Sequence, residues 1–310
     1  MSFSSQAKNN LSRLIPERAC CCRTELLALF RSDGVIHKMD DEQVLMLQFE
    51  TENAAVARKI FKLLKAMYDI SIEVAVRKKR RLKKNNKYML RVHGQEPVRL
   101  VLQDLQLDYA DRLEDDYEED FFLGDCCYRA YLRGSFLGAG SVSSPEGDYH
   151  LELTSRHASN AYFLLKAMER YDLKARINKR KGRYVIYLKG SEDIVTFLNV
   201  IGAHKKLLEF ENVRIIKELR NRVNRGVNCE TANLNKIVNT GVRQMEAILT
   251  IDRIMGIEKL KVSLREVARL RREFPSSSLQ ELGDMMDPPL SKSAINHRLR
   301  KLEEIADKLR

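Results

Sequence analysis

Residues 126–140, CCYRAYLRGSFLGAG, decide the fold because the chain carries a second version of them at residues 20–34, CCCRTELLALFRSDG. The two windows agree at six of fifteen positions with a constant offset of 106 residues. The identical pairs are Cys20/Cys126, Cys21/Cys127, Arg23/Arg129, Leu26/Leu132, Phe30/Phe136 and Gly34/Gly140. Internal similarity at a fixed offset indicates that one structural unit occurs twice.

The repeat continues beyond these windows. The stretch LLKAM at 63–67 recurs at 164–168, and a basic strand at 88–92 corresponds to 184–188. Period and β-branched content predict helix, strand, helix, β-hairpin and final helix in each copy. The expected strands are 44–49 and 149–153, the second helices 54–67 and 158–171, and the final helices 98–105 and 194–201. We therefore expect an α+β duplicated body over 1–204, with copies at about 20–106 and 126–202 and an acidic connector at 107–125.

Small residues mark one face of the first helix in each copy. They stand four positions apart, as Ala28 with Ser32 and as Gly134 with Gly138. Such residues let two helix backbones approach closely. We therefore expect these helices to pack together on a pseudo-two-fold axis, each ending at a glycine suited to a C-terminal cap, Gly34 or Gly140.

Residues 131–141, YLRGSFLGAGS, resemble the signature helix of the LAGLIDADG homing endonucleases, and residues 26–34 resemble a more eroded copy. In that family the acidic residue before the terminal glycine of each helix holds metal, because two-metal cleavage needs carboxylates at the scissile strands. This chain has Asp33 in the first copy but Ala139 in the second. The resemblance thus implies a body without a catalytic site, in which Asp33 is a solvated or capping carboxylate.

Basic residues gather in the predicted hairpins. The chain has 55 Lys plus Arg against 43 Asp plus Glu, a net charge of +12 that favours phosphate-rich partners. Sheets of the nucleases form a saddle over DNA, so we expect phosphate contacts there, with solvated hairpin tips as the alternative. The candidates are Arg77, Lys78, Lys79, Arg80, Arg81, Lys83 and Lys84 in copy one and Lys179, Arg180, Lys181 and Arg183 in copy two. Arg222 and Arg225, from an Arg/Asn-rich segment at 220–233, join them.

The cysteines show no metal-binding spacing. They are Cys20, Cys21, Cys22, Cys126, Cys127 and Cys229, with no CxxC pair among them. Because the pairs 20–21 and 126–127 are repeat equivalents, we expect small buried packing residues rather than ligands. No metal and no cofactor is expected. The chain also lacks an apolar run of about 18 residues that would span a membrane, which predicts a cytoplasmic protein.

The rest of the chain is predicted to be helical. We expect a helical linker over 205–235, whose apolar stripe within 206–222 tethers the domains, and an all-α DNA-binding domain over 236–310. Capping boxes at 263–266, SLRE, and 278–281, SLQE, predict helices near 263–274 and 278–286. A third helix at 291–308 follows two prolines, giving a helix-turn-helix at about 278–308.

The third helix has the composition of a recognition helix. Its predicted apolar stripe is Ile295, Leu299, Leu302 and Ile305. The residues left outside the stripe are Lys292, Ser293, Asn296, His297, Arg298, Arg300 and Lys301. A major groove admits such a helix, so we expect Asn296, His297 and Arg300 to contact bases and the two N-terminal residues to contact phosphate.

Three segments, 134–140, 220–233 and 287–293 with NHR at 296–298, resemble the WhiA family over essentially the whole chain. The resemblance implies a sequence-specific DNA-binding regulator of transcription linked to cell division, chromosome segregation and, in some relatives, sporulation. We expect a nucleoid-associated monomer that is not an enzyme and binds double-stranded DNA, with the transcription machinery or another regulator as a further partner. The alternatives are an adaptor whose helical domain binds protein, and a residual nuclease.

Overall fold

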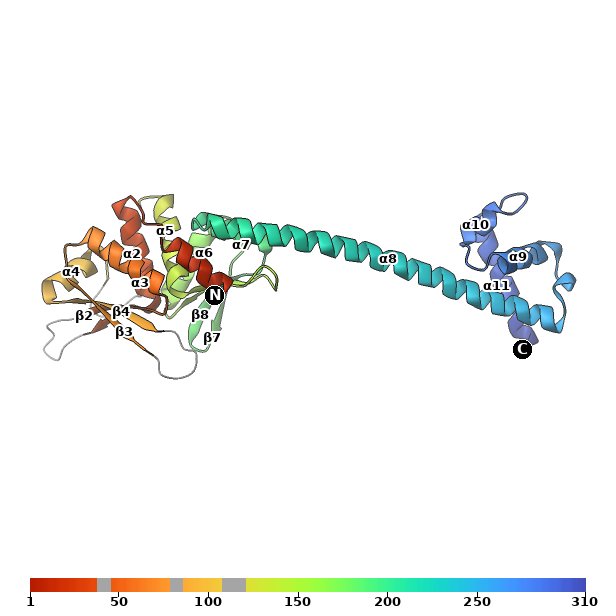
Figure 1. Cartoon of the computed structure of the whole chain (residues 1–310), viewed down its shortest axis with the longest axis horizontal. Helices are drawn as coiled ribbons and strands as arrows, with labels where there is room; N and C mark the ends of the chain where they lie inside the picture. The colour runs from red at the N-terminus through yellow and green to blue at the C-terminus, as the bar shows by residue number, and fades with distance from the viewer. Residues whose placement is uncertain (38–45, 79–85, 108–120) are drawn as a thin grey trace. The chain divides into compact units, whose positions relative to one another are not determined.

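The computed structural model describes residues 1–37, 46–78, 86–107 and 121–310, which form two compact units, Met1–Lys217 and Glu218–Arg310 (Figure 1). Helices of the first unit are α1 (Phe3–Leu11), α2 (Ala19–Asp33), α3 (Ala54–Met67), α4 (Gln95–Asp104), α5 (Asp125–Ala139), α6 (Ala158–Glu169) and α7 (Ser191–Val200). Its strands are β1 (Val35–His37), β2 (Met46–Thr51), β3 (Ile72–Arg77), β4 (Lys87–His93), β5 (Gly140–Val142), β6 (Leu151–Ser155), β7 (Arg176–Arg180) and β8 (Arg183–Leu188).

Two antiparallel sheets with the same topology confirm the duplicated α+β fold. The first has the order β1-β2-β4-β3 and the second the order β5-β6-β8-β7. In each sheet one face packs against helices, α2 and α3 on the first and α5 and α6 on the second (Figure 1). The sequence missed β1 and β5 because three residues are too few to show a period.

Helices α2 and α5 form the central seam of this unit, as the small residues predicted. A Cβ atom added to Gly134 would lie 2.6 Å from the carbonyl oxygen of Glu25, and one added to Gly138 would lie 2.4 Å from Ser32 Oγ. Only glycine therefore permits the contact with the α2 backbone at Gly134, whereas a larger residue at position 138 would require the Ser32 side chain to move.

The predicted glycine caps were wrong in their mechanism. Gly34 and Gly140 have φ angles of −74° and −90°, so neither adopts the left-handed conformation of a helix C-cap. They are glycine for steric reasons: an added Cβ would lie 2.2 Å from the Phe30 ring at one position and 2.6 Å from Phe136 at the other. The chain leaves each seam helix directly into an edge strand.

A buried ionic cluster lies beside the seam. The Glu25 carboxylate is fully buried, 2.5 Å from Lys59 Nζ and 2.9 Å from Arg133 Nη2. Lys59 is equally buried and also donates a hydrogen bond to the carbonyl of Leu11, at 3.1 Å. Burial lowers the pKa of Lys59, and the Glu25 carboxylate opposes that shift. The cluster joins α1, α3 and both seam helices.

Most predicted helix limits agree with the structure to within two residues, and the exceptions include the starts of α4 and of α7, which begins at Ser191 rather than 194. Helix α3 spans the predicted 54–67, whereas α4 begins at Gln95 rather than 98. Pro97 lies in the first turn of α4, where backbone N–H groups have no partner within the helix, so the missing N–H of proline costs no hydrogen bond. Helix α1 was not predicted. Of the acidic connector, residues 108–120 lie outside the described residues.

The second unit is helical. Helix α8 (His204–Ile254) begins in the first unit and ends in the second, followed by a 3₁₀ helix (Ile257–Lys259), α9 (Val262–Glu273), α10 (Leu279–Asp284) and α11 (Lys292–Leu309). Its core consists of apolar residues from all four α-helices, including Ile251, Val267, Leu282 and Leu299. Among the described residues no helix is long and apolar enough to cross a bilayer.

The predicted 205–235 helical linker lies within α8, which continues to Ile254. Of its predicted apolar stripe, Phe210 is buried against Phe3 and Tyr149, whereas Leu208 and Leu219 are 64% and 59% exposed. The predicted capping box at 263–266 was wrong: Ser263 does not cap α9, since Lys261 is the N-cap. Buried Leu260 and Leu264 flank that helix start.

Candidate nucleic-acid-binding surfaces

Helices α10 and α11 form the predicted helix-turn-helix. Ser278 caps α10 with a complete capping box, accepting from the backbone of Glu281 while the Glu281 carboxylate accepts from the Ser278 N–H. Gly283 lets the turn fold back, because an added Cβ would lie 2.2 Å from the carbonyl oxygen of Leu290. Ser291 then caps α11 by accepting from the N–H of Ala294.

The inner face of α11 is the apolar stripe that the sequence predicted. Ile295, Leu299 and Leu302 are buried at 0–1% exposure, and Ile305 is half-buried. They pack against α9 and α10. This packing fixes which residues of α11 face solvent.

The predicted recognition residues divide into two groups. Exposed side chains are Lys292, Ser293, His297, Arg300 and Lys301. Half-buried side chains are Asn296 and Arg298. The Arg298 guanidinium donates a hydrogen bond to the carbonyl of Ser263, 3.3 Å away. That contact ties α11 to α9, so Arg298 has a structural partner that the sequence did not indicate.

The hairpins place basic residues on the sheet faces opposite the helices. Strand register pairs Arg77 with Lys87 in the first sheet and Arg180 with Arg183 in the second. Leu90 in the first sheet and Ile186 in the second are buried and point to the core. Because side chains alternate along a strand, Lys87 and Arg183, three positions away, point outward with their partners Arg77 and Arg180. Both hairpins thus present cations on equivalent faces.

The remaining predicted phosphate contacts are distributed as follows. Lys78 and Lys181 are exposed, and Lys179 lies over the Tyr184 ring at 5.2 Å. Lys181 and Gly182 form the turn of the second hairpin, with φ angles of 49° and 77°. The candidates Lys79, Arg80, Arg81, Lys83 and Lys84 lie outside the described residues. Arg222 and Arg225 are exposed on α8.

One basic residue was missed in the second sheet. Arg176 pairs with Tyr187 and is exposed on the same outward face as Arg180, four residues along β7. The strand period could have found it, since it lies an even number of positions from Arg180. We add it to the candidate phosphate contacts.

Asp33 and Ala139, the two positions compared with the metal-binding acids of the homing endonucleases, lie where the seam helices end. Asp33 is not simply solvated or a cap, because Arg156 Nη2 lies 2.7 Å from its Oδ1 atom. On the other helix the Ala139 carbonyl accepts a hydrogen bond from Thr154 Oγ1 at 3.3 Å. The remaining carboxylate is therefore held by a cation from the other copy, 123 residues away in the chain.

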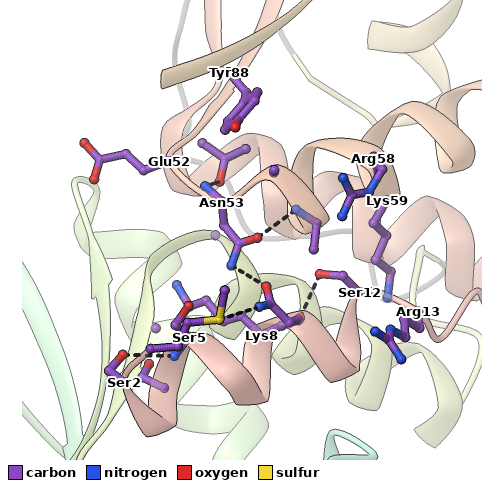
Figure 2. Close-up of a pocket in the computed structure, with 18 of the residues that line it drawn as sticks. Ser2, Ser5, Lys8, Ser12, Arg13, Glu52, Asn53, Arg58, Lys59 and Tyr88 are labelled. Carbon is purple, nitrogen blue, oxygen red and sulfur yellow. Dashed lines mark hydrogen bonds between the residues drawn. The ribbon is translucent and has the colours of Figure 1, made fainter. Parts of the chain in front are cut away.

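A polar cavity of about 1340 Å³ opens beside Asp33. Figure 2 shows side chains of α1, of the turn that follows it and of α3 around the cavity, including the basic Lys8, Arg13 and Arg58. Burial lowers the pKa of Lys8 to about 8, and Asp33 opposes that shift. A cavity with this lining suits an anion better than a divalent cation, which needs several oxygen ligands.

Sequence comparisons assign the same three parts. Residues 19–108 match the model of the WhiA N-terminal LAGLIDADG-like domain. Residues 128–220 match the WhiA LAGLIDADG-like domain, and residues 223–306 match the WhiA C-terminal HTH domain. The "Probable cell division protein WhiA" of Heliobacterium modesticaldum is 48% identical, with 99% of this chain and 96% of that protein covered. That of Desulforamulus reducens is 47% identical, with 100% and 97% covered.

A solved structure agrees with these matches. The crystal structure of full-length DUF199/WhiA from Thermatoga maritima has a TM-score of 0.59 and 25% identity, and 99% of each chain is covered. The duplicated LAGLIDADG-like unit and the helix-turn-helix unit therefore occur together in this order, and the chain belongs to the WhiA family.

Proposed function

We propose that this chain is a sequence-specific, double-stranded DNA-binding regulator of transcription that acts in cell division and chromosome segregation. The observation that carries the proposal is α11, an exposed basic helix held by a buried stripe behind a capped turn. His297 and Arg300 are exposed on it, and Asn296 lies beside them. These residue types read base edges in the major groove.

The duplicated body supports the proposal through non-specific affinity. Its outward sheet faces carry Arg77, Arg180 and Arg183, which suit phosphate oxygens. Contacts of this kind carry no sequence information but make binding steeply dependent on salt. The seam helices already pair within one chain, which favours binding as a monomer in the nucleoid.

The proposal includes the absence of nuclease activity. Asp33 is paired with Arg156, and Ala139 offers no carboxylate. Two-metal cleavage needs acidic oxygens on both sides of the seam. The body would then hold DNA without cutting it.

Selection of genomic fragments on the purified chain in the presence of Mg²⁺ tests the function. We expect enrichment of discrete promoter-proximal sites with intact strands. New strand ends at defined positions would establish a nuclease instead. A pool without enrichment, combined with weak salt dependence, would support an adaptor whose helical unit binds protein.

Variants of α11 then test the assigned surface. Loss of a base contact costs about 1–3 kcal/mol on the selected site and little on random DNA. We expect this of Arg300→Ala and His297→Ala. Lys308→Ala is the matched control, because Lys308 is an exposed cation in the last turn of the same helix. Equal losses on all sequences would remove the recognition-helix assignment.

A further inference from the structure

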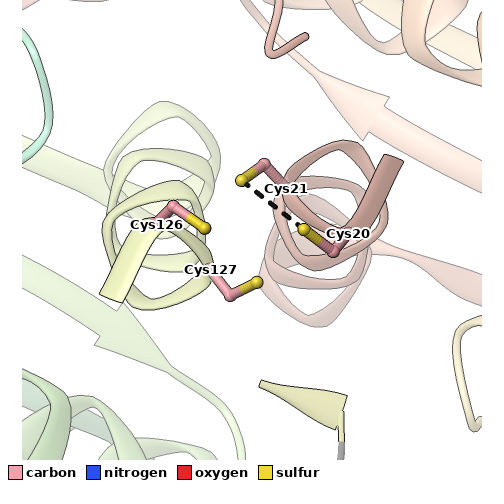
Figure 3. A group of neighbouring side chains, drawn as sticks. All are labelled: Cys20, Cys21, Cys126 and Cys127. Atoms are coloured by element: carbon pink, nitrogen blue, oxygen red, sulfur yellow. Dashed lines mark hydrogen bonds between the residues drawn. The ribbon is translucent and has the colours of Figure 1, made fainter. Parts of the chain in front are cut away.

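Four cysteines meet where the two copies join. The Sγ atoms of Cys20, Cys21, Cys126 and Cys127 all lie within 4.8 Å of one another. Figure 3 shows the four side chains between the first turns of α2 and α5, with two sulfurs from each helix. Spacing along the chain gave no sign of this group, because each pair is adjacent and the pairs lie 106 residues apart.

The sulfur separations fit a single tetrahedral ion. A metal–sulfur bond of about 2.3 Å in a tetrahedron places the sulfurs about 3.8 Å apart. Cys20 Sγ and Cys21 Sγ are 4.0 Å apart, and no pair in the group exceeds 4.8 Å. Small rotations of the side chains would close the remaining gap. A multi-iron cluster would instead need its sulfur ligands spread around several metal atoms.

Burial raises the pKa of the Cys21 and Cys127 thiols, but two features of the site favour thiolates. The cysteine pairs occupy the first turns of α2 and α5, where the helix dipole stabilises negative charge. Arg18 Nη1 lies 3.8 Å from Cys126 Sγ. Arg18, Arg129 and Arg133 line a cavity of about 370 Å³ together with Cys21 and Cys126. A divalent ion with four thiolates keeps a net negative charge, which Arg18 and Arg129 would offset, and the cavity gives the ion a route in.

We propose that Cys20, Cys21, Cys126 and Cys127 bind one zinc ion that staples the two copies of the body together. Four protein thiolates close the coordination sphere, as in structural rather than catalytic zinc sites. Each copy supplies two ligands, so the site is complete only when α2 and α5 are paired. The free energy of metal binding then contributes to the stability of the folded seam.

The proposed zinc site lies at the end of the seam opposite Asp33 and Ala139. Helix α2 has 15 residues, so Cys20 and Asp33 are separated along it by roughly 20 Å. The proposed ion therefore takes no part in contacts at the sheet faces. Its role is to hold the two sheets in a fixed relation across the pseudo-two-fold axis.

Metal analysis of the full-length chain, purified with reductant and without chelator, tests the proposal. We expect one zinc per chain in the wild type and none in Cys20→Ser/Cys126→Ser. The matched control is Cys229→Ser, because Cys229 is an exposed cysteine on α8 and should leave the zinc content unchanged. Cobalt exchanged into the wild type should give the visible bands of a tetrahedral thiolate site, a readout that does not require any variant to fold.

A strong chelator provides the second readout. It should lower the melting temperature of the wild type and of Cys229→Ser but leave the double variant unchanged. Wild-type protein without zinc and without the cobalt bands would overturn the proposal. So would iron with acid-labile sulfide, or disulfides joining the two pairs in protein kept under reductant.

Discussion

Replacing Glu25 by glutamine should destabilise the first unit more than other conservative changes near it. The carboxylate is fully buried and balances Lys59, which is also fully buried, while Arg133 is 14% exposed. A neutral amide can accept a hydrogen bond but cannot balance the lysine charge. Removing one partner of a buried ion pair costs about 3–5 kcal/mol.

The expected shift can be worked from the size of the unit. For a domain near 217 residues, each kcal/mol lowers the melting temperature by roughly 2–4 °C. Glu25→Gln should therefore lower it by roughly 6–20 °C. Thermal unfolding followed by circular dichroism, with urea titration for the free energy of unfolding, measures the change.

Two further variants test the charge balance around Glu25. Glu25→Gln combined with Lys59→Met should recover part of the loss, because the fully buried lysine charge is gone while Arg133, 14% exposed, still lacks its partner. Glu73→Gln is the control, since Glu73 pairs with Arg91 at the surface and should leave the melting temperature unchanged. A loss below about 1 kcal/mol for Glu25→Gln, or no recovery in the double variant, would refute the assigned charge balance.

Three other changes test separate parts of the fold. Gly138→Ala should cost about 1–3 kcal/mol in the free energy of unfolding, and Ser32→Gly in the same chain should restore part of it, because the added Cβ would lie 2.5 Å from Ser32 Cβ. The folded pKa of Lys8, about 8, lies below its usual 10.5, so the unfolded chain binds more protons between these values and stability should rise with pH across them. Lys8→Met should flatten that rise in urea titrations at a series of pH values, and an unchanged slope would contradict the shift. Arg271 Nη1 donates to the carbonyls of Phe274, Pro275 and Ser277, so Arg271→Met should cost about 1–3 kcal/mol and speed amide exchange at 274–278, whereas unchanged exchange would exclude this role.

The sequence predicted those features whose signals are local or repeated. The duplicated windows gave the seam of α2 and α5, and the period of Ile295, Leu299 and Leu302 gave the inner face of α11. Both depend on side chains that recur on one face of a helix, which a single sequence displays directly.

The features that were missed depend on contacts between distant segments. Arg156 meets Asp33 across 123 residues, and Arg298 meets Ser263 across 35. Neither contact leaves a periodic trace. The four clustered cysteines were judged only by their spacing along the chain. Their proximity follows from the pairing of α2 with α5. The alignment of the two copies placed the cysteine pairs at equivalent positions of these helices and could have predicted the cluster.

The salt bridge between Arg156 and Asp33 also constrains how this scaffold can evolve. An acidic residue at position 139 would not by itself give two unpaired carboxylates, because the opposite carboxylate, Asp33, is paired with the Arg156 guanidinium. Losing Arg156 alone would leave a single acidic side chain without its counterpart. At least two substitutions would therefore be needed before both helix ends offered an unpaired carboxylate, the arrangement that two-metal cleavage needs.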